Sequence, residues 1–135
     1  FYNLIPTLTA EENIALPWKL DGRKENKERL EEIVKRLGLE KRAKHLPGQM
    51  SGGQQQRVSI GRALINEPAF LLADEPTGNL DSKTGREIMD ILKTTNQKYN
   101  QTILLVTHDE KIALQASRII TLGDGKIVKD EVMRV

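Results

Sequence analysis

The sequence contains no cysteine, which excludes disulfides, thiolate metal sites and thiol nucleophiles and is compatible with a reducing compartment. Long hydrophobic runs are also missing, and the longest apolar stretches are short segments such as residues 69–73 and 103–106. A helix needs about 20 apolar residues to cross a bilayer, so we expect no membrane-spanning segment. The mean hydropathy of −0.48 agrees with a chain that folds in water.

An excess of charge of one sign is absent as well. Lys and Arg total 21 against 19 Asp and Glu, a formal net charge of +2, which gives no reason to expect a nucleic-acid partner. The chain begins FYNLIPTLTA, with no basic region leading into an apolar stretch, so it does not begin with a secretory signal. It also lacks an initial Met. We expect these 135 residues to be one domain or part of one, cut or processed from a longer protein.

Helical patterns dominate the first half of the chain and recur in the second. Thr9 and Glu12 have the spacing of a capping box, and Pro17 is expected to stop the helix that they start. Farther on, Glu32 and Arg36 form an i,i+4 pair on the solvent side of an amphipathic segment. The first two expected helices span residues 10–15 and 24–37, and Gly38 ends the second. The third begins between residues 51 and 53 and ends near residue 65. The last two span about residues 83–98 and a short segment after Asp109.

Three short apolar runs are typical of buried strands, at residues 70–73, 103–106 and 118–122. The Gly-Asp-Gly sequence at 123–125 predicts a hairpin turn into residues 126–129. Strands that alternate with helices in the second half indicate a parallel α/β sheet.

Polar residues follow two of these strands. Asp74 and Glu75 end the first strand and His108 follows the second, and the carboxyl ends of parallel strands share the edge where ligands bind. One carboxylate there could hold Mg²⁺ while the other polarises an attacking water, and a neutral imidazole could donate to a phosphate oxygen. The alternatives are a solvated turn at the carboxylates and an exposed or strand-capping histidine. Asp81 lies in the polar turn that follows, whereas His45, in a charged loop, is assigned no role.

A second candidate phosphate site lies at the start of the third expected helix. Gly52 and Gly53 leave backbone N–H groups open to a ligand, and the helix dipole attracts an anion to them.

These stretches together resemble the nucleotide-binding subunit of ATP-binding cassette (ABC) transporters. MSGGQQQRVSIGRAL, from Met50, resembles the signature motif of that family, usually LSGGQ. FLLADEPTGNLD resembles the Walker B strand and D-loop, and VTHDE resembles the switch-histidine segment, all in the family's order and spacing. FYNLIPTLTAEENI is similar to the stretch after the Q-loop glutamine. With DEPTGNLDSKTG, it resembles the branch of macrolide exporters, lipoprotein-release systems and antimicrobial-peptide resistance transporters.

The resemblance implies a fold and a role for each motif residue. The implied fold is α/β, a partial P-loop NTPase-like ABC ATPase with a helical subdomain over residues 1–66 and the C-terminal part of the parallel-sheet core over residues 67–135. Asp74 would support Mg²⁺, Glu75 would be the catalytic base, and His108 would contact the γ-phosphate of ATP. Ser51, Gly52 and Gly53 would bind the γ-phosphate of the ATP held by the opposite subunit, and Gln54 would complete the signature. Asp81 would report across the dimer. Gln55, Gln56 and Arg57 would stabilise the surroundings of the motif.

One family motif is not in the sequence. The P-loop pattern G-x-x-x-x-G-K-[ST] occurs nowhere, since Gly125-Lys126 is followed by Ile127. The family pattern implies that the P-loop, the base-stacking aromatic residue and the Q-loop glutamine precede Phe1. Without the P-loop amides and lysine the β- and γ-phosphates lose their main cradle. We therefore expect the 135 residues alone neither to bind ATP tightly nor to hydrolyse it.

The resemblance also implies an activity and partners. The implied protein is a cytoplasmic ATPase on the inner face of the cell membrane that powers transport, in which two nucleotide-binding subunits sandwich two ATP molecules beside a transmembrane permease. Residues 1–20 would face the permease, with Leu4, Ile5 and Leu8 either contacting it or closing the chain's own core. The alternatives are a soluble ABC-type ATPase of DNA repair or translation, and a non-catalytic interaction module. We also expect an oligomer, because exposed strand edges invite association.

Overall fold

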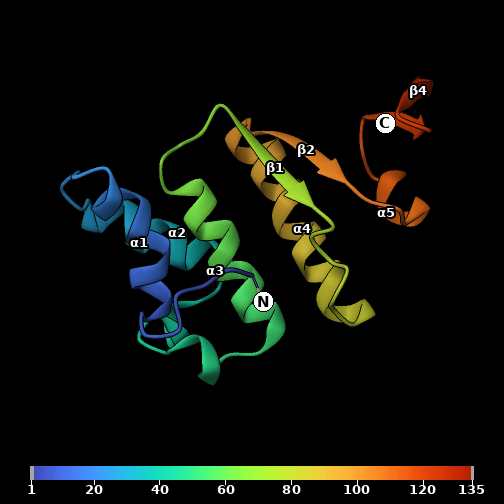
Figure 1. Ribbon diagram of the computed structural model, residues 1–135. Coiled ribbons are helices and arrows are strands. Elements are labelled where there is room, and N and C mark those ends of the chain that lie inside the picture. Colours follow the sequence, from blue (N-terminus) through green and yellow to red (C-terminus); the bar gives the residue numbers. More distant parts are fainter. Residues whose placement is uncertain (1, 135) are drawn as a thin grey trace.

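The computed structural model describes residues 2–134. It contains a cluster of α1, α2 and α3, a central pair of strands with α4 alongside, and a terminal hairpin beyond α5 (Figure 1). The helices are α1 (Ala10–Leu20), α2 (Lys27–Arg36), α3 (Gly52–Leu64), α4 (Ser82–Tyr99) and α5 (Glu110–Ala113), with single 3₁₀ turns η1 (Glu40–Arg42) and η2 (Pro47–Gln49). The strands are β1 (Phe70–Asp74), β2 (Thr102–Val106), β3 (Arg118–Gly123) and β4 (Lys126–Val132). None of the described helices has the length and apolar character that a bilayer crossing requires.

The apolar faces of α1, α2, α3 and α4 form the core. Ile14, Ile33, Val58 and Ile88, one from each of these helices, are fully buried. Gly61 of α3 allows α1 to approach closely, because a Cβ there would lie 3.1 Å from Cδ1 of Ile14. Each such buried side chain contributes roughly 1.5–3 kcal/mol to folding, so this helical packing positions the loops described below.

Helix α1 continues through Pro17, and the prediction that it stops ahead of this proline is wrong. Thr9 and Glu12 do form the predicted capping box, through bonds of 3.2 and 3.3 Å. Beyond the proline, Trp18 packs into the core and is only 6% exposed. Burying about 200 Å² of indole at about 25 cal/mol/Å² contributes about 5 kcal/mol. This gain exceeds the roughly 3 kcal/mol cost of a proline inside a helix, so the helix continues.

The segment before α1 is held by Asn13, a fully buried side chain. Its Oδ1 accepts from the backbone N–H of Ile5, and its Nδ2 donates to the carbonyl of Leu8. Leu4 packs against the core, whereas Ile5 is 40% exposed. Of the two expected roles for these residues, contact with a permease or closure of the chain's own core, the structure gives Leu4 the second. Phe1, the first residue of the segment expected to face a permease, lies outside the described residues.

Helix α2 starts later than predicted, because the side chain of Asn26 caps it. It ends at the predicted Gly38, which has a φ of +64°. The ion pair between Glu32 and Arg36 forms, with 2.5 Å between Oε1 and Nη2. Its placement on the solvent side is wrong for Arg36, whose side chain is only 8% exposed. The guanidinium lies over the Tyr99 ring, 3.3 Å from the centroid, which ties α2 to the end of α4.

Strands β1 and β2 pair in parallel, as predicted, with α4 as the crossover between them. Leu71 is buried and Leu105 is half-buried, on the face that the helices cover (Figure 1). On the other face Leu72 is 65% exposed and Leu104 is 56% exposed. The prediction of buried strands therefore holds for one face only, since the described elements pack on that face alone.

Strand β3 forms the predicted hairpin rather than a third parallel strand, and most of its residues are exposed, so the prediction that residues 118–122 form a buried strand is wrong. It pairs antiparallel with β4, which continues to Val132 rather than ending near residue 129. The predicted turn is confirmed, since Asp124 and Gly125 have φ angles of +47° and +74°, as a tight two-residue hairpin requires. The connection between β2 and β3, residues 107–117, falls just short of the dozen or more residues that a parallel crossover needs. A hairpin partner follows directly in sequence, so β3 pairs locally.

Candidate functional site

Glu75 and His108 meet at the carboxyl ends of β1 and β2. Oε1 of Glu75 lies 2.6 Å from Nδ1 of His108 and accepts the His108 backbone N–H at 2.9 Å. Thr107 donates its hydroxyl to Oε2 of Glu75 at 3.3 Å. The prediction that residues following two strands share one sheet edge is thereby confirmed. The hydrogen bond from the His108 side chain is the main cause that lowers the pKa of Glu75 below its ordinary value, so this carboxylate is ionised at neutral pH.

The backbone at Glu75 is strained. Its φ is +44°, in the left-handed region, which costs roughly 1–2 kcal/mol for a residue with a side chain. Two backbone bonds hold it there: its N–H donates to the carbonyl of Val106 at 2.8 Å, and its carbonyl accepts from Gly78 at 3.1 Å. The second bond closes a β-turn with Pro76 in its favoured second position. Strain that the surroundings enforce in this way is typical of functional sites.

Asp74 is the last residue of β1, lies opposite Val106 and is exposed. The described residues include no group of three or more histidines, cysteines or carboxylates that could hold a metal. Magnesium in nucleotide sites takes one or two carboxylates and completes its shell with phosphate oxygens and water. The oxygens of Glu75 are engaged by His108 and Thr107. The exposed carboxylate of Asp74 is therefore the group whose chemistry fits a Mg²⁺ that arrives with a nucleotide.

Ser51 and Gln54 form a capping box at the start of α3. The Ser51 hydroxyl accepts the N–H of Gln54 at 3.2 Å, and Oε1 of Gln54 accepts the N–H of Ser51 at 2.9 Å. Gly52, exposed at the first helical position, carries one of the N–H groups that a helix start leaves without a partner within the helix. The predicted phosphate-binding segment is thus a rigid, exposed helix start, which suits an anion.

Gly52 and Gly53 also pack against the start of α4 and the loop before it. A Cβ on Gly53 would lie 2.3 Å from Cγ2 of Thr84, a distance that real atoms do not adopt. A Cβ on Gly52 would lie 3.5 Å from Cδ2 of Leu80, which is an ordinary contact. Gly53 is therefore required for packing, a role that the sequence did not reveal.

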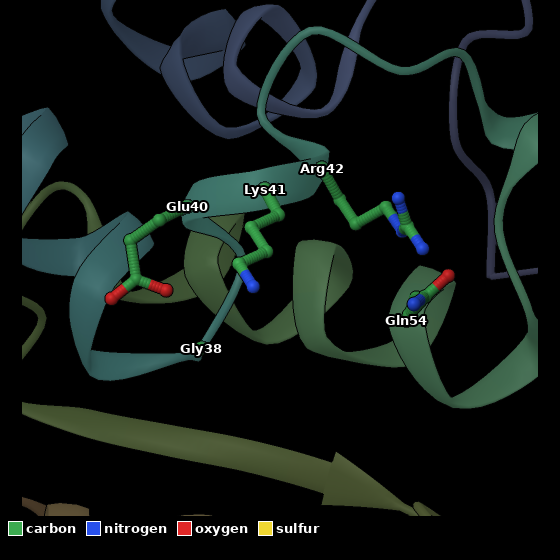
Figure 2. Close-up of a pocket in the computed structure, with 5 residues that line it drawn as sticks. All are labelled: Gly38, Glu40, Lys41, Arg42 and Gln54. Carbon is green, nitrogen blue, oxygen red and sulfur yellow. The ribbon is translucent and has the colours of Figure 1, made fainter.

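A pocket of about 620 Å³ lies between η1 and the first turn of α3 (Figure 2). Figure 2 shows Arg42 extending from η1 toward Gln54, with Lys41 beside it and Glu40 pointing to the other side. Sequence reasoning missed Lys41 and Arg42. The adjacent basic residues in the loop before the glycine pair were the available signal, but their approach to α3 depends on the tertiary fold.

Asp81 caps helix α4. Its Oδ2 accepts the backbone N–H groups of Lys83 and Thr84 at 3.2 and 3.1 Å. The side-chain hydrogen bond with Thr84 is the largest cause that lowers the pKa of Asp81 below its ordinary value. In the structure as described, this carboxylate is engaged with α4 rather than with the Glu75 and His108 pair.

The residues after the signature stabilise its surroundings, as predicted. Gln55 donates to the carbonyl of Pro47 at 3.0 Å and so holds the loop before the motif. Arg57 bonds Glu87 of α4 at 2.9 Å. Gln56 donates to the carbonyl of Pro76 at 2.7 Å, which joins α3 to the turn that follows β1.

Comparisons with known proteins agree with this arrangement. Residues 1–78 match the family model described as ABC transporter. The chain is 50% identical over 131 residues to the macrolide export ATP-binding/permease protein MacB of Pasteurella multocida, covering 96% of this chain and 20% of MacB. It is 50% identical over 139 residues to the uncharacterized ABC transporter ATP-binding protein MJ0796 of Methanocaldococcus jannaschii, covering 98% of this chain and 59% of that protein.

The fold is similar to a solved dimeric structure of the ATP-binding cassette MJ0796 in a post-hydrolysis state, bound to ADP and Pi. The TM-score is 0.82 at 46% identity, over 99% of this chain and 60% of that chain. The chain therefore spans at most 60% of the length of these relatives.

Proposed function

The chain belongs to the ABC transporter family, and from that premise we propose that it forms part of an ATP-hydrolysing subunit that powers transport across a membrane. The observation that carries this proposal is the pair of Glu75 and His108 at one sheet edge, directly beside the exposed carboxylate of Asp74. An ionised base, a histidine and a metal ligand at this edge are what hydrolysis of a nucleoside triphosphate requires.

In the proposed reaction the carboxylate of Glu75 accepts a proton from the water that attacks the γ-phosphorus, while the bond from that phosphorus to the β–γ bridging oxygen breaks and ADP leaves. His108 donates to that carboxylate through Nδ1, and as an imidazolium, with both ring nitrogens protonated, it would also donate from Nε2 to a γ-phosphate oxygen. Asp74 would hold Mg²⁺, which neutralises charge on the phosphate oxygens when it is bound. The chain's own contribution is to orient the base and to keep it ionised.

We propose that the signature segment acts on a second nucleotide. The N–H group of the exposed Gly52 and the hydroxyl of the exposed Ser51 lie at a helix start, which suits the γ-phosphate of an ATP held by another copy. Lys41 and Arg42 add positive charge beside that helix start. Asp81, at the start of α4, would report across the same dimer. The dimeric state of MJ0796, a relative of similar fold, supports a homodimer-like sandwich.

The wider setting is part of the same proposal. Residues 1–66 would form the helical subdomain, and residues 67–135 the C-terminal part of the ATPase core. The partners would be a second nucleotide-binding subunit and a transmembrane permease, with the ATPase in the cytoplasm on the inner face of the membrane. MacB, whose name joins ATP-binding and permease, supports such a partner.

The test is Glu75→Gln in the protein expressed from its complete coding sequence. We expect kcat to fall about 100-fold or more, because the base is lost. Hydrolysis by the unaltered protein should stop when a chelator removes the divalent metal. ATP binding should be retained in the variant, which isothermal titration calorimetry would measure alongside phosphate release.

Glu110→Gln is the matched control for charge, since Glu110 is an exposed carboxylate two positions after His108. Its kcat should match that of the unaltered protein. Full turnover in Glu75→Gln, or no metal-dependent turnover in the unaltered protein, would refute the proposed function.

A further inference from the structure

We propose that Gln56 is a positioning residue for the base Glu75, an inference that rests on the proposed function. Nε2 of Gln56 donates a 2.7 Å hydrogen bond to the carbonyl oxygen of Pro76, the residue after Glu75. Gln56 lies on α3 within one turn of the signature segment. The bond therefore joins the helix that begins with the signature to the turn that carries the base of the same chain.

The carbonyl of Pro76 takes no part in the hydrogen bond that closes the turn. That bond runs from the Gly78 N–H to the carbonyl of Glu75, which leaves the Pro76 carbonyl directed elsewhere. Pro76 is buried, and a buried carbonyl needs a donor. Gln56 supplies that donor from outside the turn, at the point where Glu75 holds its strained φ of +44°.

The base is consequently held from two sides. Its carboxylate is bonded to Thr107 and His108 after β2, and the carbonyl of the following residue, Pro76, is bonded to α3. A shift of the Pro76 peptide would rotate the Glu75 backbone and move the carboxylate away from the attacking water. Displacements of about 1 Å at a reacting group cost on the order of 100-fold in rate, so a single bond at this place can control kcat.

Contacts of the signature glycines reinforce the link. Gly53 packs tightly on Thr84 and Gly52 lies against Leu80, so the first turn of α3 covers the segment that follows the base. The signature and the base of one chain therefore belong to one packed unit. A nucleotide that moves the signature of this chain would also move its base, and Gln56 is the hydrogen-bonded part of that connection.

Gln56→Met tests the inference in the protein expressed from its complete coding sequence. Methionine has nearly the same length but cannot donate the bond. We expect kcat to fall about tenfold or more with the KM for ATP unchanged, because the base is displaced while the nucleotide contacts remain. Gln56→Lys keeps a donor of sufficient reach and should hold kcat within about threefold of the unaltered protein.

Gln101→Met is the matched control, because Gln101 also donates from Nε2 to a prolyl carbonyl, that of Pro68. This bond lies at the opposite end of β1 and β2, so its loss should lower the melting temperature without lowering kcat. If Gln56→Met does not fold, Gln56→Glu, which also lacks the donor, replaces it.

Two results would overturn the inference. One is an unchanged kcat in a folded variant that lacks the donor, Gln56→Met or Gln56→Glu. The other is a similar fall in kcat in Gln101→Met or in Gln56→Lys. Either can occur while Glu75→Gln still abolishes hydrolysis, which would leave the proposed function intact. Absence of hydrolysis in the unaltered protein would instead remove both.

Discussion

At the scale of single residues, two adjacent glycines have different surroundings and therefore different reasons to be glycine. Gly52 is exposed at the first position of α3, and a Cβ there would make only ordinary contacts. Gly53 is buried, and a Cβ there would overlap Thr84 of α4. Thr84 is β-branched and stiff in a helix, so it cannot move aside easily. The close approach of α3 to α4 thus depends on one glycine of the pair.

We predict that Gly53→Ala lowers the free energy of unfolding by about 1–3 kcal/mol, the usual cost of an overpacked contact. Gly52→Ala should change it by less than about 1 kcal/mol, since the helix tolerates alanine and space is available. Urea denaturation of the two variants, followed by circular dichroism, measures both values. Equal effects would show that the Thr84 contact does not limit the packing.

The sequence could predict which residues lie at the strand ends, but not which hydrogen bonds from other elements hold those residues in place. Asp74, Glu75 and His108 follow apolar runs directly, so the rule that parallel strands end at one edge was enough to bring them together. The bond from Gln56 to Pro76 joins residues 20 positions apart and leaves no local pattern in the sequence. Such contacts depend on how the helices pack, which periodicity alone does not fix.

At the scale of elements, the predictions fail where a neighbour decides the outcome. Pro17 is a strong local stop signal, but burial of Trp18 beyond it outweighs the lost hydrogen bond. The apolar run that became β3 has the pattern of a buried strand, yet most of its residues are exposed, because β3 pairs with β4 in a separate two-stranded sheet. Helices with clear caps and periodicity, such as α3 and α4, begin and end within about a residue of where the sequence placed them.

The β3–β4 hairpin is pinned by a bidentate ion pair between Arg118 and Asp130, with bonds of 2.9 and 2.7 Å. The side-chain hydrogen bond with Arg118 is the main cause that lowers the pKa of Asp130 below its ordinary value. A lowered folded-state pKa means that the stabilisation is present at neutral pH and is lost as pH falls through that pKa, below about pH 4.

Arg118→Gln should raise the pKa of Asp130 back toward its ordinary value, which NMR titration of the Asp130 carboxyl carbon measures. Lys129→Gln removes the same charge from the hairpin, but Lys129 is paired with Glu131 instead, so it should leave the Asp130 titration nearly unchanged. An identical Asp130 titration in Arg118→Gln and the unaltered chain would contradict the proposed pairing.

At the scale of the whole molecule, the two-stranded sheets expose large apolar side chains. They lie on the uncovered face of β1 and β2 and along the hairpin, and the most exposed are Phe70, Leu72, Leu104, Val106, Leu122, Ile127, Val128 and Val132. Apolar surface of this kind is more typical of an interface than of a free surface. The expectation that the chain associates with further protein stays a prediction, and these faces are where we expect the contact.

The residues present in the site also predict whether the 135-residue chain hydrolyses ATP by itself. They include the proposed base, metal ligand and signature, but their sequence has no P-loop pattern to cradle the β- and γ-phosphates. Positioning and charge stabilisation supply most of the catalysis in phosphoryl transfer, so an unheld triphosphate leaves Glu75 without an oriented target. The purified 135-residue chain, shown to be folded by circular dichroism, should therefore release phosphate from ATP no faster than its Glu75→Gln variant. Metal-dependent turnover that this substitution abolishes would mean that other residues of the chain hold the triphosphate.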